Sequence, residues 1–225
     1  MPQPVPLDRR NRNRTRARWA IAGLASLTLL AAGPASTALA AAKPTVPAGY
    51  TITKIANAPA GAANCDDIAF LAGHLFVGCQ DKTLSNGGGG NSTLVEYSLS
   101  GAVVKTWSIK DKIDGLQADP LKNFVIASLD EDAATHMVTV TPSAAASKQV
   151  TYYTYSPDPR GASTPTALRT GGGTDQVTVD SAGHIFTTGS HAGTSTGTAV
   201  FKVVLTPPKT PTGTGKATLS STYLD

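Results

Sequence analysis

Short runs of alternating apolar and polar residues recur along the chain, and each run ends in a turn. A similar five-residue motif begins three successive groups of these runs, at residues 66–70, 114–118 and 175–179. The first and third copies continue alike, with an Ala-Gly-His turn followed by a second apolar run. The copies start 48 and 61 residues apart, which is the size of one four-stranded propeller blade. The pattern predicts an all-β fold, a β-propeller of four-stranded blades.

Three blades are expected, at about residues 66–109, 114–155 and 175–224 of a propeller domain that covers 50–225. Each blade contains four segments rich in β-branched and aromatic residues, which favour strands. Propellers hide their edges by closing a ring of roughly four to eight blades, so three blades leave two flanks exposed. We therefore expect the chain to be a truncated part of a six- or seven-bladed ring. A homodimer that completes six blades is the alternative.

Residues 1–40 have the layout of a secretory signal peptide. Six Arg residues precede an apolar run at 19–32, and Ala38-Leu39-Ala40 offers a small-x-small cleavage site. The apolar run has 14 residues, fewer than the roughly 20 that cross a bilayer. We expect a secreted, extracellular protein with no stable membrane anchor after cleavage. Residues 41–49, with two prolines, are then an extended linker.

Removal of this leader changes the charge of the chain. The whole sequence has a net charge of +4, but its first 40 residues hold six Arg and one Asp. The remaining chain therefore carries 13 basic and 14 acidic residues, a net charge of −1. The basic residues are scattered, so nothing in the composition favours nucleic acid or an anionic membrane as a partner.

The two cysteines, Cys65 and Cys79, flank the first predicted hairpin. If residues 71–73 form a three-residue loop with the glycine in the left-handed conformation, Phe70 pairs with His74 and the cysteines lie opposite each other. A disulfide is expected in an oxidising compartment, where closing this 15-residue loop stabilises the fold by roughly 3 kcal/mol. A redox or metal-binding pair lacks the close spacing or the accompanying His that such sites need.

One face of the predicted propeller gathers most of the polar candidates. In a meander, the loop before the first strand and the loop between the second and third strands lie at the same end. Carboxylates that converge there around an axis would bind a hard cation such as Ca²⁺ or have raised pKa values. The predicted metal ligands are Asp66, Asp114 and Asp175, and the predicted ligand-binding residues are Asp67, Gln176, Asp81, Asp130 and His191.

Each of these aspartates could have a structural role instead of a binding role. An Asp that precedes or follows a strand can cap a turn by accepting backbone N–H bonds. Repetition is compatible with both roles, because repeats reproduce scaffold residues in every blade. Asp67 and Gln176 differ between the copies, and this favours them as binding residues over their neighbours.

The segments 114–120, 123–128 and 177–186 resemble the blade phrase of the SMP-30/gluconolactonase-like and NHL-repeat propellers. The resemblance covers residues 52–224 and implies a divalent ion on the axis, held by a Glu, two Asn and an Asp. The matching positions are Asp66 or Asp67, Ile113-Asp114 and Asp175-Gln176, with Ile113 and Asp175 in place of the two Asn. Residues 93–99 resemble a phrase of the streptogramin lyase propellers.

These observations lead to one expected function and two alternatives. We expect a secreted propeller that binds a small molecule or an extracellular partner through its loop-rich axial face. A Ca²⁺-dependent lactonase or related hydrolase is the first alternative, because of the carboxylates and the resemblance. A lyase of the streptogramin type is the second.

Overall fold

The computed structural model describes residues 45–84, 88–130, 136–156, 173–189 and 200–220. The chain divides into two compact units, residues 1–50 and 51–225. The predicted signal peptide lies outside the described residues, and so do the first four residues of the predicted linker. Within the described ranges, no helix is long and apolar enough to cross a membrane.

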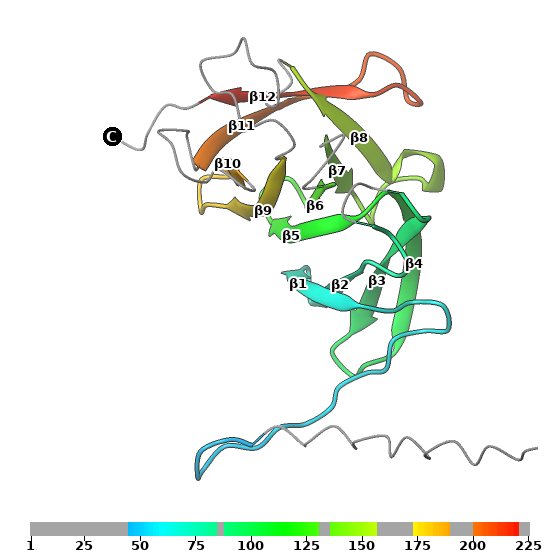
Figure 1. The fold of residues 1–225 in the computed structure, drawn as a ribbon, viewed down its shortest axis with the longest axis vertical. Helices are drawn as coiled ribbons and strands as arrows, with labels where there is room; N and C mark the ends of the chain where they lie inside the picture. The colour runs from blue at the N-terminus through cyan, green and yellow to red at the C-terminus, as the bar shows by residue number, and fades with distance from the viewer. Residues whose placement is uncertain (1–44, 85–87, 131–135, 157–172, 190–199, 221–225) are drawn as a thin grey trace, which may run out of the picture. The chain divides into compact units, whose positions relative to one another are not determined.

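The second unit is all-β in its described parts, apart from a three-residue 3-10 helix, η1 (Ala146–Lys148) (Figure 1). Four strands form an antiparallel sheet in the order in which they occur in the chain. We call them the first meander: β1 (Cys65–Leu71), β2 (His74–Cys79), β3 (Asn91–Ser98) and β4 (Val103–Lys110).

A second sheet contains eight strands, which form two further meanders. The second meander comprises β5 (Ile113–Asp119), β6 (Phe124–Leu129), β7 (His136–Val140) and β8 (Val150–Tyr155). The third meander comprises β9 (Thr174–Val179), β10 (Ile185–Gly189), β11 (Val200–Thr206) and β12 (Gly215–Ser220). The strands expected from the sequence pattern are thus found in all three series, with boundaries shifted by a few residues.

The outer strands β8 and β12 join the second and third meanders by parallel pairing. The strand order is β5-β6-β7-β8-β12-β11-β10-β9, and the two end strands, β5 and β9, contact each other, so this sheet is nearly closed and barrel-like. Gly215 begins β12 at the junction, where an added Cβ would lie 2.5 Å from the ring of Tyr153 and 2.6 Å from the carbonyl oxygen of Thr206. The close approach of the two strands therefore requires glycine.

Apolar faces hold the meanders together. One core cluster joins the first and second meanders and contains Phe76, Trp107, Ile113 and Leu129. The Phe76 and Trp107 rings stack with their centroids 6.2 Å apart. A second cluster joins the second and third meanders. Because the second meander packs on both sides, nearly every residue of β5, β6 and β7 is buried, whereas β1 alternates between buried and exposed positions.

The β1–β2 hairpin differs from its predicted form. Ala72 and Gly73 form a two-residue turn with positive φ angles of 50° and 85°, as in a type I′ hairpin. Leu71 therefore pairs with His74, and the predicted Phe70–His74 pair is wrong. The loop is one residue shorter than expected because the right-handed twist of the strands favours a type I′ turn.

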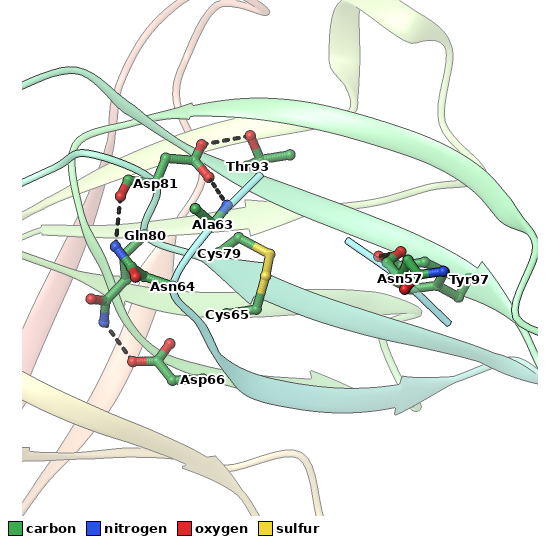
Figure 2. The surroundings of a disulfide bond; sticks show 10 residues. All are labelled: Asn57, Ala63, Asn64, Cys65, Asp66, Cys79, Gln80, Asp81, Thr93 and Tyr97. Atoms are coloured by element: carbon green, nitrogen blue, oxygen red, sulfur yellow. Dashed lines mark hydrogen bonds between the residues drawn. A yellow bond between two sulfur atoms is a disulfide. The ribbon is translucent and has the colours of Figure 1, made fainter. Parts of the chain in front are cut away.

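The predicted Cys65–Cys79 disulfide is nevertheless confirmed, and Figure 2 shows it between β1 and β2. The register shifts between Cys65 and Asp67, so a one-residue bulge compensates for the shorter turn. Cys65 consequently pairs with Cys79. The sulfur of Cys79 is fully buried and packs in a small cluster with Val95 and Tyr97.

Candidate functional site

The candidate site is built where the first strands of the three meanders begin. β5 contacts both β1 and β9, and Figure 1 shows it between them. Four predicted residues lie within the first residues of these strands and not in the preceding loops: Asp66 and Asp67 on β1, Asp114 on β5 and Asp175 on β9. Glycine permits the close approach of β5 and β9, because a Cβ on Gly115 would lie 2.9 Å from the carbonyl oxygen of Asp175.

Asp67 and Gln176 meet although 109 residues separate them in the chain. The side-chain Nε2 of Gln176 donates to Oδ1 of Asp67 at 3.5 Å, a long contact that links the first meander to the third. Burial, followed by the charge of Asp66, raises the pKa of Asp67 to about 6, and the charges of Asp114 and Asp175 contribute further. The structure thus brings these predicted residues into one electrostatic environment.

Asp66 and Asp114 each have a protein partner. Gln80 donates from Nε2 to Oδ2 of Asp66 at 2.7 Å, as Figure 2 shows. The Nζ of Lys112 lies 2.5 Å from Oδ1 of Asp114, and both side chains are largely buried. A buried cation therefore already balances one of the three predicted metal ligands.

Asp81 and Asp130 occupy equivalent positions in the first and second meanders. Asp81 follows β2, and its Oδ1 accepts a hydrogen bond from the N–H of Ala63 while its own N–H donates to the Ala63 carbonyl oxygen. Asp130 follows β6 and makes the same two bonds with Lys112. Both residues have positive φ angles, 57° and 59°. We call this reciprocal pair of bonds the backbone clamp; it gives both aspartates the turn-capping role.

The clamp is extended differently in the two meanders. In the first, Oδ2 of Asp81 accepts a hydrogen bond from the hydroxyl of Thr93 (Figure 2). In the second, Oδ2 of Asp130 faces Nδ1 of His136 at 3.7 Å. The equivalent position in the third meander, with the predicted residue His191, lies outside the described residues.

Two residues of this site escaped prediction from the sequence. Asp111 lies between β4 and β5, and its Oδ2 is 3.3 Å from Nε2 of His136, the first residue of β7. Burial raises the pKa of Asp130 to about 6, and the nearby charges of Asp111 and Asp114 add to the increase, whereas the N–H of Lys112 and the charge of His136 lower it. The sequence signal was weak, a lone His before an apolar run and an Asp between two Lys.

Four aspartates near the starts of β1, β5 and β9 form an acidic group, which we call the carboxylate face: Asp66, Asp67, Asp114 and Asp175. The charge of Asp114 contributes to the raised pKa values of both Asp67 and Asp130. Lys112 is engaged by Asp114, and Lys110 is mostly exposed with its Nζ 3.9 Å from Asp111. The local charge is therefore negative.

The calcium site stays a prediction. Ca²⁺ takes roughly six to eight oxygen ligands, and one of the three predicted ligands, Asp114, already has the cation of Lys112 as its partner. In the described part of the chain, the group with three potential ligand atoms close enough to share an ion is Asp111, Asp130 and His136. Asp66, Asp114 and Asp175 do not form such a group there.

Comparison of the chain with protein-family models, curated proteins and solved structures gave no match. The residues of the carboxylate face are therefore the basis for a functional proposal.

Proposed function

We propose that this chain is an exported β-propeller protein that binds a positively charged ligand or partner through the carboxylate face. The observation that carries the proposal is the convergence of Asp67, Asp114 and Asp175 from three meanders, with Gln176 bonded to Asp67. The charges of Asp66, Asp114 and Asp175 disfavour ionisation of Asp67, and a bound ammonium or guanidinium group would relieve that repulsion.

The arrangement of the meanders supports a propeller. Each has four antiparallel strands in chain order, successive meanders pack through apolar faces, and their first strands lie next to one another. These features are expected of blades around an axis. The parallel pairing of β8 with β12 departs from the pattern. A six- or seven-bladed ring, or a homodimer that completes a ring, belongs to the same proposal, and molecular mass in solution tests it.

Export is supported by two independent features. The leader has the three regions of a signal peptide, and the disulfide joins the only two cysteines of the sequence, as is usual in oxidising compartments. Determining the N-terminus of the protein recovered from the culture medium tests the proposal. We expect it to be Ala41, and retention of the whole chain inside the cell would contradict export.

Fluorescently labelled tetralysine and tetraglutamate peptides test the binding proposal. Anisotropy at pH 7.5 and low salt should show tetralysine binding and no tetraglutamate binding. The double variant Asp67→Asn, Asp175→Asn should bind tetralysine about 10-fold more weakly, because two charges leave the face. Asp180→Asn is the matched control, since Asp180 is an exposed aspartate at the β9–β10 turn. Equal affinity of both peptides, or no effect of the double variant, would refute the proposal.

A Ca²⁺-dependent lactonase of the SMP-30 type is the second candidate. The same convergence of carboxylates favours it, and Asp66, Asp114 and Asp175 would be the ligands, although Lys112 opposes a further cation at Asp114. A calorimetric titration of Ca²⁺ into the wild type and into the Asp114→Ala and Asp175→Ala variants distinguishes the two candidates. Saturable binding that both variants lose would justify a screen of lactones. The absence of binding by the folded protein would remove this candidate.

A further inference from the structure

The side chains of Asp111, Asp130 and His136 meet at the junction between the first and second meanders. They come from three separate segments: the link between β4 and β5, the residue after β6, and the first residue of β7. Their side chains are 16%, 2% and 14% exposed, respectively. The group is therefore sheltered but still open to solvent at Asp111 and His136.

The geometry of the group is that of a chelating site. One ligand atom from each residue lies within 4.8 Å of the other two. Nε2 of His136 is 3.3 Å from Oδ2 of Asp111, close to the roughly 3.3–3.5 Å that separates neighbouring ligands of a tetrahedral ion with bonds of about 2.0–2.2 Å. The second ring nitrogen, Nδ1, faces Oδ2 of Asp130 at 3.7 Å.

Several contacts hold the three residues in place. The backbone clamp with Lys112 fixes Asp130 through Oδ1, and Oδ2 points toward His136. The His136 ring lies 6.1 Å from the ring of Tyr152. The hydroxyl of Tyr152 in turn accepts a hydrogen bond from the N–H of Lys110, next to Asp111. Such preorganisation reduces the entropy that a ligand set loses when it closes around an ion.

We propose that Asp111, Asp130 and His136 bind one divalent transition-metal ion of the Zn²⁺ class. Imidazole nitrogen with two carboxylate oxygens is a donor set for Zn²⁺ and its neighbours in the first transition row, whereas Ca²⁺ and Mg²⁺ prefer oxygen alone. Three protein ligands leave further coordination positions for water.

The competing explanation is a purely structural contact in which His136 bridges the two aspartates through its two ring nitrogens. Both explanations use the same contacts, but they predict opposite responses to a metal. A structural ion pair is indifferent to Zn²⁺, whereas a chelating group binds the ion saturably, with one ion per chain.

Isothermal titration of Zn²⁺ into the full chain at pH 7.0 tests the proposal. We expect saturable binding of one ion per chain. Asp111→Asn, Asp130→Asn and His136→Gln should each weaken binding at least about 100-fold, because each removes one of three ligands. Titration with Co²⁺ should give visible absorption bands, which the three variants lose.

Asp81→Asn is the matched control. Asp81 makes the same backbone clamp as Asp130, but the hydroxyl of Thr93 takes the place of His136. This variant should bind Zn²⁺ within about twofold of the wild type. Asp67→Asn serves as a second control, because Asp67 belongs to the carboxylate face and not to this group. The proposed Zn²⁺ site does not rest on the proposed binding of positively charged ligands.

Two results would overturn the proposal: the folded wild type shows no saturable Zn²⁺ binding, or His136→Gln binds as tightly as the wild type. Near-UV circular dichroism checks the fold of each variant. If a buried variant fails to fold, Asp111→Asn replaces it, because Asp111 is the most exposed of the three. Nitrogen NMR of the histidine rings adds a test on the unaltered chain, and an absence of any Zn²⁺-dependent shift would also overturn the proposal.

Discussion

The first and second meanders contain the same backbone clamp but surround it differently. In the first, the carboxylate of Asp81 is satisfied by a backbone N–H and the hydroxyl of Thr93. In the second, Asp130 lies beside Asp111 and His136, and burial, with a further contribution from the charge of Asp111, raises its pKa. The comparison shows that two aspartates with the same structural role can differ in their chemical surroundings, because different side chains lie next to them. The clamp positions the carboxylate, and the adjacent strand decides what the second oxygen contacts.

Burial distinguishes the two meanders as well. The second packs against another meander on both faces, whereas one face of the first packs only against its own preceding segment, at Ala56 and Ala62. Ile126 on β6 is completely buried, whereas Ile68 on β1 is 63% exposed. The isoleucine on β6 should therefore contribute far more to the free energy of unfolding than the isoleucine on β1.

The largest predicted effect uses this pair of isoleucines. Ile126→Ala should lower the free energy of unfolding by about 2–5 kcal/mol, because it leaves a cavity in a packed core. Ile68→Ala should cost less than about 0.5 kcal/mol, as is usual for exposed positions. Urea unfolding followed by circular dichroism measures both. Similar costs for the two variants would show that the exposed face of β1 is covered in solution.

Loss of the disulfide should have the next largest effect. The bridge lies within the first meander, between Cys65 and Cys79. The double variant Cys65→Ala, Cys79→Ala should lower the free energy of unfolding by roughly 3 kcal/mol, mainly because the unfolded chain regains the entropy of an open loop. Urea unfolding of the variant, compared with that of the oxidised wild type, measures the loss. A change below about 1 kcal/mol would contradict a stabilising role for the bridge.

The clamps themselves provide a third, smaller difference. Asp81→Ala should cost about 0.5–1.5 kcal/mol, because the exposed N–H of Ala63 and the hydroxyl of Thr93 lose their acceptor. Asp130→Ala also removes an acceptor, but it relieves the repulsion with Asp111 and Asp114, so its cost should be lower by about 1 kcal/mol. Thermal unfolding of the two variants at pH 7 makes the comparison. A larger loss for Asp130→Ala would place His136 as its stabilising partner.

The smallest predicted effect concerns pH. The pKa of Asp67 is about 6 in the folded chain against an ordinary value of 3.8, so folding favours the protonated carboxyl. Its contribution to stability is complete below about pH 4 and is lost as the pH rises through 6. Asp67→Asn should therefore stabilise the protein at pH 7 by about 1 kcal/mol, a value reduced from the full shift because solvent screens this partly exposed group.

Urea unfolding of the wild type and Asp67→Asn between pH 4 and pH 7.5 measures this contribution. The wild type should lose stability relative to the variant across that window. The slope due to Asp130 has the same sign and should persist in Asp67→Asn. Parallel curves for the two proteins would mean that the pKa of Asp67 is not raised.

Local pattern was sufficient for the strands of the three meanders and for the pairing of the cysteines, but the β1–β2 turn is one residue shorter than predicted. Alternation of apolar and polar residues predicts a strand because side chains along a pleated backbone point to opposite faces in turn. The same pattern placed the aspartates in the loops that enter β1, β5 and β9, whereas they lie within the first residues of those strands. These inferences depend on residues that are neighbours in the chain.

Tertiary packing decided the rest. The bulge near Asp66, the parallel pairing of β8 with β12 and the junction of Asp111 with His136 all join segments that the sequence separates. Each depends on how twisted sheets stack and how closely their backbones approach, which no local pattern encodes. The sequence by itself determined an all-β chain with a disulfide and a series of strand-initial aspartates. Only the folded structure determined which of those carboxylates share a site, because long-range contacts follow from packing.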